Sequence, residues 1–340
     1  MKIIVRLALV LALAWGGVSA GPAAAADYII RSTQVFASTH PWNKGLEKFK
    51  EVIEKTSNGR IRVEVYPAGQ LSGGNIRTMN EQVQIGTLQL LVQSPLGWAG
   101  LASKALIFDL PFLMPDNKTG LKVVRSPLAK EILDEALAGL GVTGLDFWEN
   151  GYRVITHRNK IIRKPDDFKG VKIRIPPNPL FTEIYTSLGA TPVAMSTSEI
   201  YTALQQGAVD AQENPVSAIY SNKFYEVAPK ITMWKYCWDP GMLTINSQFY
   251  NDLPPDLRQA VDAAILEAGD LVASLVAKDD AEVLDIFQKN GAEIYYQTPE
   301  ETQAFIDFLK PIYDKFTPEF GADKIEKLRQ LIAETAAQAN

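Results

Sequence analysis

Two pieces of sequence decide the fold: KGVKIRIPPNPL at residues 169–180 and TALQQGAVDAQENP at residues 202–215. In the first piece, apolar residues alternate with Lys172 and Arg174, which predicts a short strand that stops at Pro176. This places a guanidinium at a strand end. Because ligand sites in open α/β sheets gather at the ends of strands, we expect this guanidinium to clamp a carboxylate.

The second piece brings further polar groups to the same region. Residues 197–206 predict a helix and residues 209–212 a short buried strand. Together they deliver Glu213 and Asn214 just before Pro215. Asn214 can both donate and accept a hydrogen bond, so it suits a polar solute.

Strands and helices alternate in the chain before residue 150, which favours a parallel, doubly wound α/β sheet. The expected strands cover residues 28–35, 60–66, 88–93 and 142–148. Later segments predict further helices, at residues 180–188, 215–227 and, as a pair, 300–337. A single helix is predicted over residues 119–140.

Two places in the chain suggest a passage between two α/β domains. The strand pattern pauses at residues 149–151 before a new strand begins at residue 153, and residues 231–245 form a strand long enough to cross back. We expect a cleft between the two domains. The predicted domain I covers residues 27–150 plus 240–279, and domain II covers residues 151–239 plus 280–332.

A long amphipathic helix is predicted after Pro255. Residues 255–290 contain one glycine, and apolar side chains recur every three, four or seven positions. About 35 residues at 1.5 Å each span on the order of 50 Å, which exceeds one small domain. We expect the helix to lie along both domains and to pass between them at the polar residues 278–280. Two shorter helices with a kink there are the alternative.

Composition limits the possible chemistry. The chain has 340 residues, enough for two domains, and a net charge of −5, which argues against a nucleic-acid partner. Cys237 is the only cysteine, so no intramolecular disulfide forms. The chain has only two histidines, His40 and His157. It therefore lacks the clusters of cysteine and histidine that bind zinc, and it contains no nucleophile motif. We expect binding without catalysis, no metal and no cofactor.

The N-terminus is typical of an export signal. Lys2 and Arg6 precede an apolar run at residues 7–18, and alanines follow at residues 24–26. The run is shorter than the about 20 residues of a membrane span. We therefore predict a signal peptide at residues 1–26, cleaved near Ala26, and a periplasmic mature protein. A retained anchor is the alternative.

Local pattern leaves two other interpretations open for the polar residues. Arg174 and Arg153 could each make an ordinary surface ion pair, which is worth little. Asp210 and Glu213 could form a catalytic acid/base pair. Carboxylates three residues apart across a strand end are more often structural.

Several segments, in their order and spacing, resemble the solute-binding subunits of tripartite ATP-independent periplasmic (TRAP) transporters, the DctP-like family. These segments are EQVQIGTLQL (81–90), FDLPFL (108–113), FKGVKIRIP (168–176), EIYTALQQGAVDAQENP (199–215) and FYEVAPK (224–230). The resemblance covers nearly the whole mature chain. It implies the two-domain periplasmic binding protein fold of class α/β, with crossing strands and a long domain-spanning helix.

The resemblance also implies a function. Such proteins bind an organic acid, for example a dicarboxylate or a sugar acid, close around it and deliver it to the membrane permease subunits. We expect this protein to do so as a monomer. An exported enzyme acting on a carboxylated substrate, and a receptor that presents its ligand to a signalling partner, are the alternatives.

Ten positions are implied as ligand contacts. By resemblance, Arg174 is the carboxylate clamp, Arg153 a supporting arginine and Asn214 an amide that reaches the ligand. Gln93 and Ser94 follow the third strand, where the first domain contributes contacts.

The remaining positions would determine which acid is bound. His40 and Asn75 open helices that face the cleft in similar proteins. Thr197 stands where the family often has an aromatic ring, which leaves space or a hydroxyl contact. Trp238 and Asp239 lie in a segment that often touches substrate, where a ring can stack and a carboxylate can accept hydrogen bonds. Packing at the hinge between the domains would explain Trp238 and Asp239 equally well.

Overall fold

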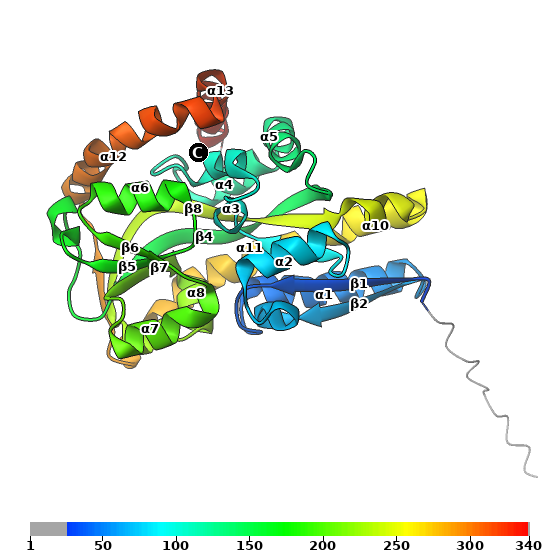
Figure 1. Ribbon diagram of the computed structural model, residues 1–340, viewed down its shortest axis with the longest axis horizontal. Coiled ribbons are helices and arrows are strands. Elements are labelled where there is room, and N and C mark those ends of the chain that lie inside the picture. The colour runs from blue at the N-terminus through cyan, green and yellow to red at the C-terminus, as the bar shows by residue number, and fades with distance from the viewer. Residues whose placement is uncertain (1–25, 339–340) are drawn as a thin grey trace, which may run out of the picture.

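The computed structural model describes residues 26–338, and the predicted signal peptide lies almost entirely outside them. A single nine-stranded sheet carries the fold, with strand order β2-β1-β3-β8-β4-β7-β5-β6 and β9 beside β8 (Figure 1). The strands are β1 (Tyr28–Gln34), β2 (Ile61–Tyr66), β3 (Leu90–Gln93), β4 (Val142–His157), β5 (Lys172–Ile175), β6 (Thr191–Ala194), β7 (Ala211–Pro215), β8 (Lys230–Asn246) and β9 (Glu293–Tyr296).

Helices cover both faces of the sheet. The α-helices are α1 (Pro41–Thr56), α2 (Ile76–Gln84), α3 (Pro95–Trp98), α4 (Asn117–Val124), α5 (Pro127–Leu137), α6 (Pro179–Ser187), α7 (Ile200–Gln206), α8 (Val216–Ser221), α9 (Phe224–Val227), α10 (Ser247–Asp252), α11 (Pro255–Lys289), α12 (Pro299–Phe320) and α13 (Ala322–Ala337). Short 3₁₀ turns are η1 (Pro67–Ser72), η2 (Ser103–Asp109), η3 (Pro165–Phe168) and η4 (Thr197–Glu199). None of the helices in residues 26–338 is both long and apolar enough to cross a membrane.

The sheet has two parallel ends and an antiparallel centre. At one end β1 pairs in parallel with β2 and β3, and at the other β5 pairs in parallel with β6 and β7. The long strands β4 and β8 run antiparallel to each other between these ends. Each end is therefore a small α/β unit, and β4 and β8 connect the two units, as the predicted crossing strands require.

The predicted pause at residues 149–151 is not a break in the strand. β4 runs through it without interruption, but its register with β8 shifts between Glu149 and Gly151. Gly151 has φ of 101°, a conformation that favours glycine, so the irregular pattern marks a bulge. After this bulge β4 also pairs with β7, starting at Arg153.

Helix α11 runs unbroken for 35 residues and contacts elements of both units. Its buried residues from Leu257 to Val276 pack in one apolar core with α1, whereas Val283 and Phe287 belong to a second core with α7 and α9. The change of core falls between Val276 and Val283, a stretch that contains the polar residues 278–280. The helix therefore spans both units, and the kinked alternative is wrong.

Several boundaries differ from the predictions, each for a local reason. The helix predicted over residues 119–140 is two helices, because Ser126 caps a new helix that starts at Pro127. The helix predicted over residues 215–227 is likewise divided, at Lys223 with φ of 58°. The short strands β6 and β9 were not predicted.

Candidate functional site

A cavity of about 30 Å³ lies where two pairs of parallel strands end. The carboxyl ends of β1 and β3 supply one side, and those of β5 and β7 supply the other. Seven of the ten predicted contact residues line it: Gln93, Ser94, Arg153, Arg174, Thr197, Asn214 and Asp239. The cavity is thus built from both units, at the position where open α/β sheets bind ligands.

Arg174 is buried in this cavity without an acidic partner. Its side chain is 1% exposed, and its Nε and Nη2 both donate to the carbonyl oxygen of Met195, at 3.1 and 2.8 Å. Across residues 26–338, no carboxylate forms an ion pair with it. Burial lowers the pKa of Arg174 to about 9 because its charge is poorly solvated. The guanidinium is therefore held in place by a backbone carbonyl and not by an ion pair.

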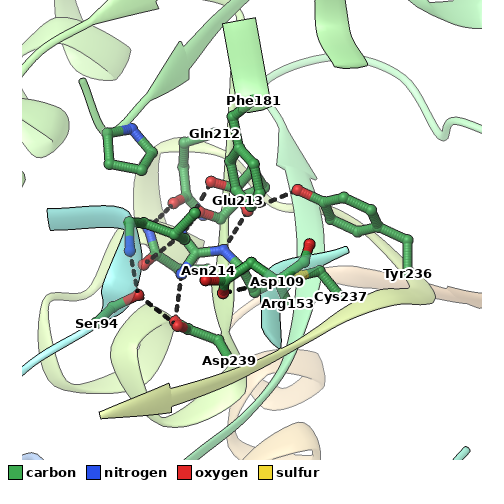
Figure 2. A network of polar contacts seen from close by, with 12 residues as sticks. Ser94, Asp109, Arg153, Phe181, Gln212, Glu213, Asn214, Tyr236, Cys237 and Asp239 are labelled. Atoms are coloured by element: carbon green, nitrogen blue, oxygen red, sulfur yellow. Dashed lines mark hydrogen bonds and ion pairs between the residues drawn. The ribbon is translucent and has the colours of Figure 1, made fainter. Parts of the chain in front are cut away.

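Arg153, in contrast, is fully engaged by the protein. Its Nε and Nη2 pair with the carboxylate of Glu213, and its Nη1 lies 2.5 Å from Asp239 Oδ2 (Figure 2). Burial alone would lower the pKa of Arg153, but these two carboxylates raise it well above its usual value. Arg153 also donates to Asn214 Oδ1, at 3.2 Å. Its role in the structure is therefore to fix neighbouring groups.

Asp239 joins the two units. Its Oδ1 accepts a hydrogen bond from Ser94 Oγ at 2.5 Å, and its Oδ2 accepts the bond from Arg153 (Figure 2). Asn150 Nδ2 also donates to Oδ2, at 2.7 Å. Ser94 begins helix α3 directly after β3. This carboxylate on β8 thus contacts the end of β3 and the bulged part of β4 together.

Asn214 is oriented by a chain of side-chain hydrogen bonds. Its Nδ2 donates to Gln212 Oε1 at 2.6 Å, and Gln212 Nε2 donates in turn to Thr156 Oγ1 at 2.8 Å. All three side chains are buried. Because Arg153 also donates to Oδ1 of Asn214, both ends of this amide are held, and the side chain has one fixed orientation toward the cavity.

Two further buried acidic groups, Glu213 and Asp109, lie near Arg153. Burial raises the pKa of Glu213, although Arg153 opposes the rise. Burial and the nearby Asp239 raise the pKa of Asp109 well above its usual value. Cys237 Sγ lies 3.4 Å from the Asp109 carbonyl oxygen, and Tyr236 donates to Glu213 at 3.3 Å (Figure 2).

Three predicted contact residues lie outside the cavity. Trp238 packs on Gly120 of helix α4, because it points to the opposite face of β8 from Asp239. His40 is fully buried as the cap of α1, where its Nδ1 accepts from the Trp42 amide at 3.1 Å, and burial lowers its pKa to about 3. Asn75 is exposed and caps α2.

The apolar part of the cavity lining was not predicted. It consists of Val35, Phe36, Trp42, Ile76, Leu96 and Pro176. Only Pro176 had a local signal, as the residue that stops β5. The others come from loop and helix starts in the first unit, where an apolar residue in the sequence does not distinguish a cavity wall from a packed core.

The acid/base alternative receives no support from the geometry. Glu213 is paired with Arg153, whereas Asp210 Oδ2 accepts a hydrogen bond from the Lys172 amide at 2.9 Å. The two carboxylates therefore have separate structural partners. Residues 26–338 contain no cluster of three or more histidine, cysteine or acidic side chains arranged to hold a metal ion.

A family model and a curated relative both match this chain over most of its length. Residues 32–319 match the family model DctP, described as bacterial extracellular solute-binding protein, family 7. The chain is 33% identical over 315 residues to the "C4-dicarboxylate-binding periplasmic protein DctP" of Rhodobacter capsulatus, covering 92% of this chain and 93% of the relative.

Solved structures agree in fold and in size. A TRAP periplasmic solute-binding protein from Ralstonia eutropha with bound (S)-2-acetolactate is 32% identical, with a TM-score of 0.85, covering 90% of this chain and 99% of the other. One from Sulfurospirillum deleyianum with bound succinate is 29% identical, with a TM-score of 0.84 and the same coverage.

Proposed function

This chain belongs to the DctP family, the bacterial extracellular solute-binding proteins of family 7, and we propose that it captures an organic acid through an ion pair between the acid's carboxylate and Arg174. It is a solute-binding protein of the TRAP type, and such proteins deliver their solute to membrane permease subunits. The ligand of the Ralstonia eutropha relative has one carboxylate and that of the Sulfurospirillum deleyianum relative has two. Family membership therefore leaves the kind of acid open.

One observation supports the carboxylate clamp. Arg174 is a buried guanidinium without a counter-ion, at the junction of four strand ends. A buried cation of this kind costs free energy until an anion neutralises it. Asn214, held in one orientation, would supply an amide contact beside the ion pair, and Gln93 and Thr197 would supply further polar contacts.

Capture would proceed by closure of the cleft. Domain I (residues 27–150 plus 240–279) would move against domain II (residues 151–239 plus 280–332), with bending in β4, β8 and α11. The cavity of about 30 Å³ is far smaller than the roughly 300–1,000 Å³ of typical small-molecule sites, so the two sides must separate to admit a solute. The protein would act in the periplasm, after removal of residues 1–26.

A thermal-shift screen tests this proposal. The panel contains short monocarboxylates, dicarboxylates and sugar acids, each beside its uncharged amide. A carboxylate present at 100 times its dissociation constant should add about 2.7 kcal/mol to the free energy of unfolding, and the amide should add nothing measurable. If no acid stabilises the protein, or if the amides act equally well, the carboxylate clamp is wrong.

A further inference from the structure

We propose that the cavity selects monocarboxylates with an apolar body and discriminates against dicarboxylates. This inference rests on the proposed function, because it assumes that Arg174 binds the first carboxylate. It concerns what the rest of the cavity accepts. Its support comes from the charges on the lining, from the hydrogen bonds that those charges already make, and from the apolar wall.

Among the described residues, the cavity lining contains two cations, Arg153 and Arg174, and one anion, Asp239. Arg153 is the only lining cation left to pair with a second ligand carboxylate. Every nitrogen of Arg153 already donates to Glu213, Asp239 or Asn214. Binding a second carboxylate at Arg153 would require breaking a buried ion pair, which is costly.

A second ligand carboxylate would also meet negative charge. Asp239 lines the cavity and is fully buried. Glu213 does not line the cavity, but it is the second carboxylate paired with Arg153. Like charges in a poorly solvated site repel strongly, because little water screens them. The part of the cavity away from Arg174 therefore rejects an anion.

Part of the remaining wall is suited to a hydrocarbon group, although polar side chains line the cavity as well. Phe36, Trp42, Ile76, Leu96 and Pro176 line the cavity, and Phe36 and Trp42 pack on each other with ring centroids 5.3 Å apart. These side chains offer apolar contact to the far end of a solute.

Calorimetry on matched pairs of acids tests the inference. Butyrate and succinate both have four carbons and differ in whether the second end is a methyl or a carboxylate. 2-Hydroxybutyrate and malate form a second such pair. We expect the monocarboxylate of each pair to bind at least tenfold more tightly than its dicarboxylate partner.

The Asp239→Asn variant tests the cause of the selectivity. The amide keeps the shape of Asp239 but removes its charge and frees part of Arg153, so the preference for butyrate over succinate should fall at least fivefold. Simple loss of structure would weaken both acids together. Asp134→Asn, at an exposed carboxylate paired with Lys130 on helix α5, is the matched control and should leave the ratio unchanged.

Three results are informative even if Asp239→Asn does not fold, because the wild-type comparison stands alone. Tighter binding of butyrate and 2-hydroxybutyrate supports the inference. Equal or tighter binding of succinate and malate overturns it, while the carboxylate clamp remains. Absence of binding by all four acids and by the wider screen overturns the proposed function itself. A folded Asp239→Asn protein with the wild-type ratio excludes Asp239 as the selecting residue.

Discussion

Arg153 on β4 and Asp239 on β8 form a buried ion pair across the two strands that connect the units, with Nη1 2.5 Å from Oδ2. Their side chains are 3% and 0% exposed. The pair lies beside the cavity but is complete without a ligand. It differs in this respect from Arg174, whose charge has no partner in the described protein. The two arginines should therefore respond to mutation in opposite ways.

Replacing Arg153 with methionine should destabilise the free protein by about 3–5 kcal/mol. The change leaves Glu213 and Asp239 buried without their cation, and this uncompensated charge is the main cost. Urea denaturation followed by circular dichroism measures it. The triple variant Arg153→Met, Glu213→Gln, Asp239→Asn removes all three charges and should recover at least half of the loss. A single variant that costs less than about 1 kcal/mol would contradict this view of Arg153.

Replacing Arg174 with alanine should weaken binding of a carboxylate ligand by about 2–5 kcal/mol. The free protein should change in unfolding free energy by only about 1 kcal/mol, because Arg174 forms a direct ion pair with no carboxylate of the described residues. Arg174→Lys keeps the charge but not the planar fork, and should lose part of the affinity. Calorimetry with the best acid from the screen measures each variant. Arg77→Ala, at a side chain that is 87% exposed on α2, is the control.

Glu149 should make the protein less stable as pH rises. Burial raises its pKa from 4.5 to about 8, and Asp280 adds to the rise. The folded protein thus holds a proton that the unfolded chain releases, so stability is lost between pH 4.5 and about 8. This group contributes at most about 1.4 kcal/mol per pH unit in that range.

The Glu149→Gln variant isolates this contribution. Urea denaturation at several pH values between 5 and 8 should show that the variant gains stability over the wild type as pH rises. Glu131→Gln, at an exposed side chain on α5, is the control and should keep the wild-type slope. A difference between Glu149→Gln and wild type that stays constant with pH would show that Glu149 is not the titrating group.

The position of Arg174 could be predicted because its signals are local. Alternation sets the face of a four-residue strand, and Pro176 sets its end, so both are readable within a few residues. The long helix α11 was predictable for the same reason, since one spacing holds over its whole length. Pro127 shows the limit of this approach. It continues an apolar pattern, yet it starts a new helix.

The rest of the site depends on contacts between distant segments. Asn150 and Asp239 are 89 residues apart in sequence, and Arg153 and Glu213 are 60 apart. No local pattern predicts such pairs. Trp238 and Asp239 make the same point, because adjacent strand residues face opposite sides. Only the register of β8 with β4 decides which one reaches the cavity.

Close packing of α1, β4 and α11 gives the last prediction. A Cβ atom on Gly45 would lie 2.4 Å from Val272 Cγ2 and 2.7 Å from Trp148 Cζ3, which is too close for either neighbour to stay in place. Alanine favours a helix by about 1 kcal/mol over glycine, but overpacking costs about 1–3 kcal/mol, so Gly45→Ala should be destabilising or neutral in urea denaturation. Adding Val272→Ala removes the closer of the two contacts but leaves Trp148 Cζ3 at 2.7 Å, so the Gly45→Ala change should cost less in the double variant without becoming favourable. Gly100→Ala, where a Cβ meets no atom within 4 Å, should stay within about 0.5 kcal/mol of wild type. A clear gain in stability from Gly45→Ala alone would mean that α11 packs less tightly on α1 than these distances require.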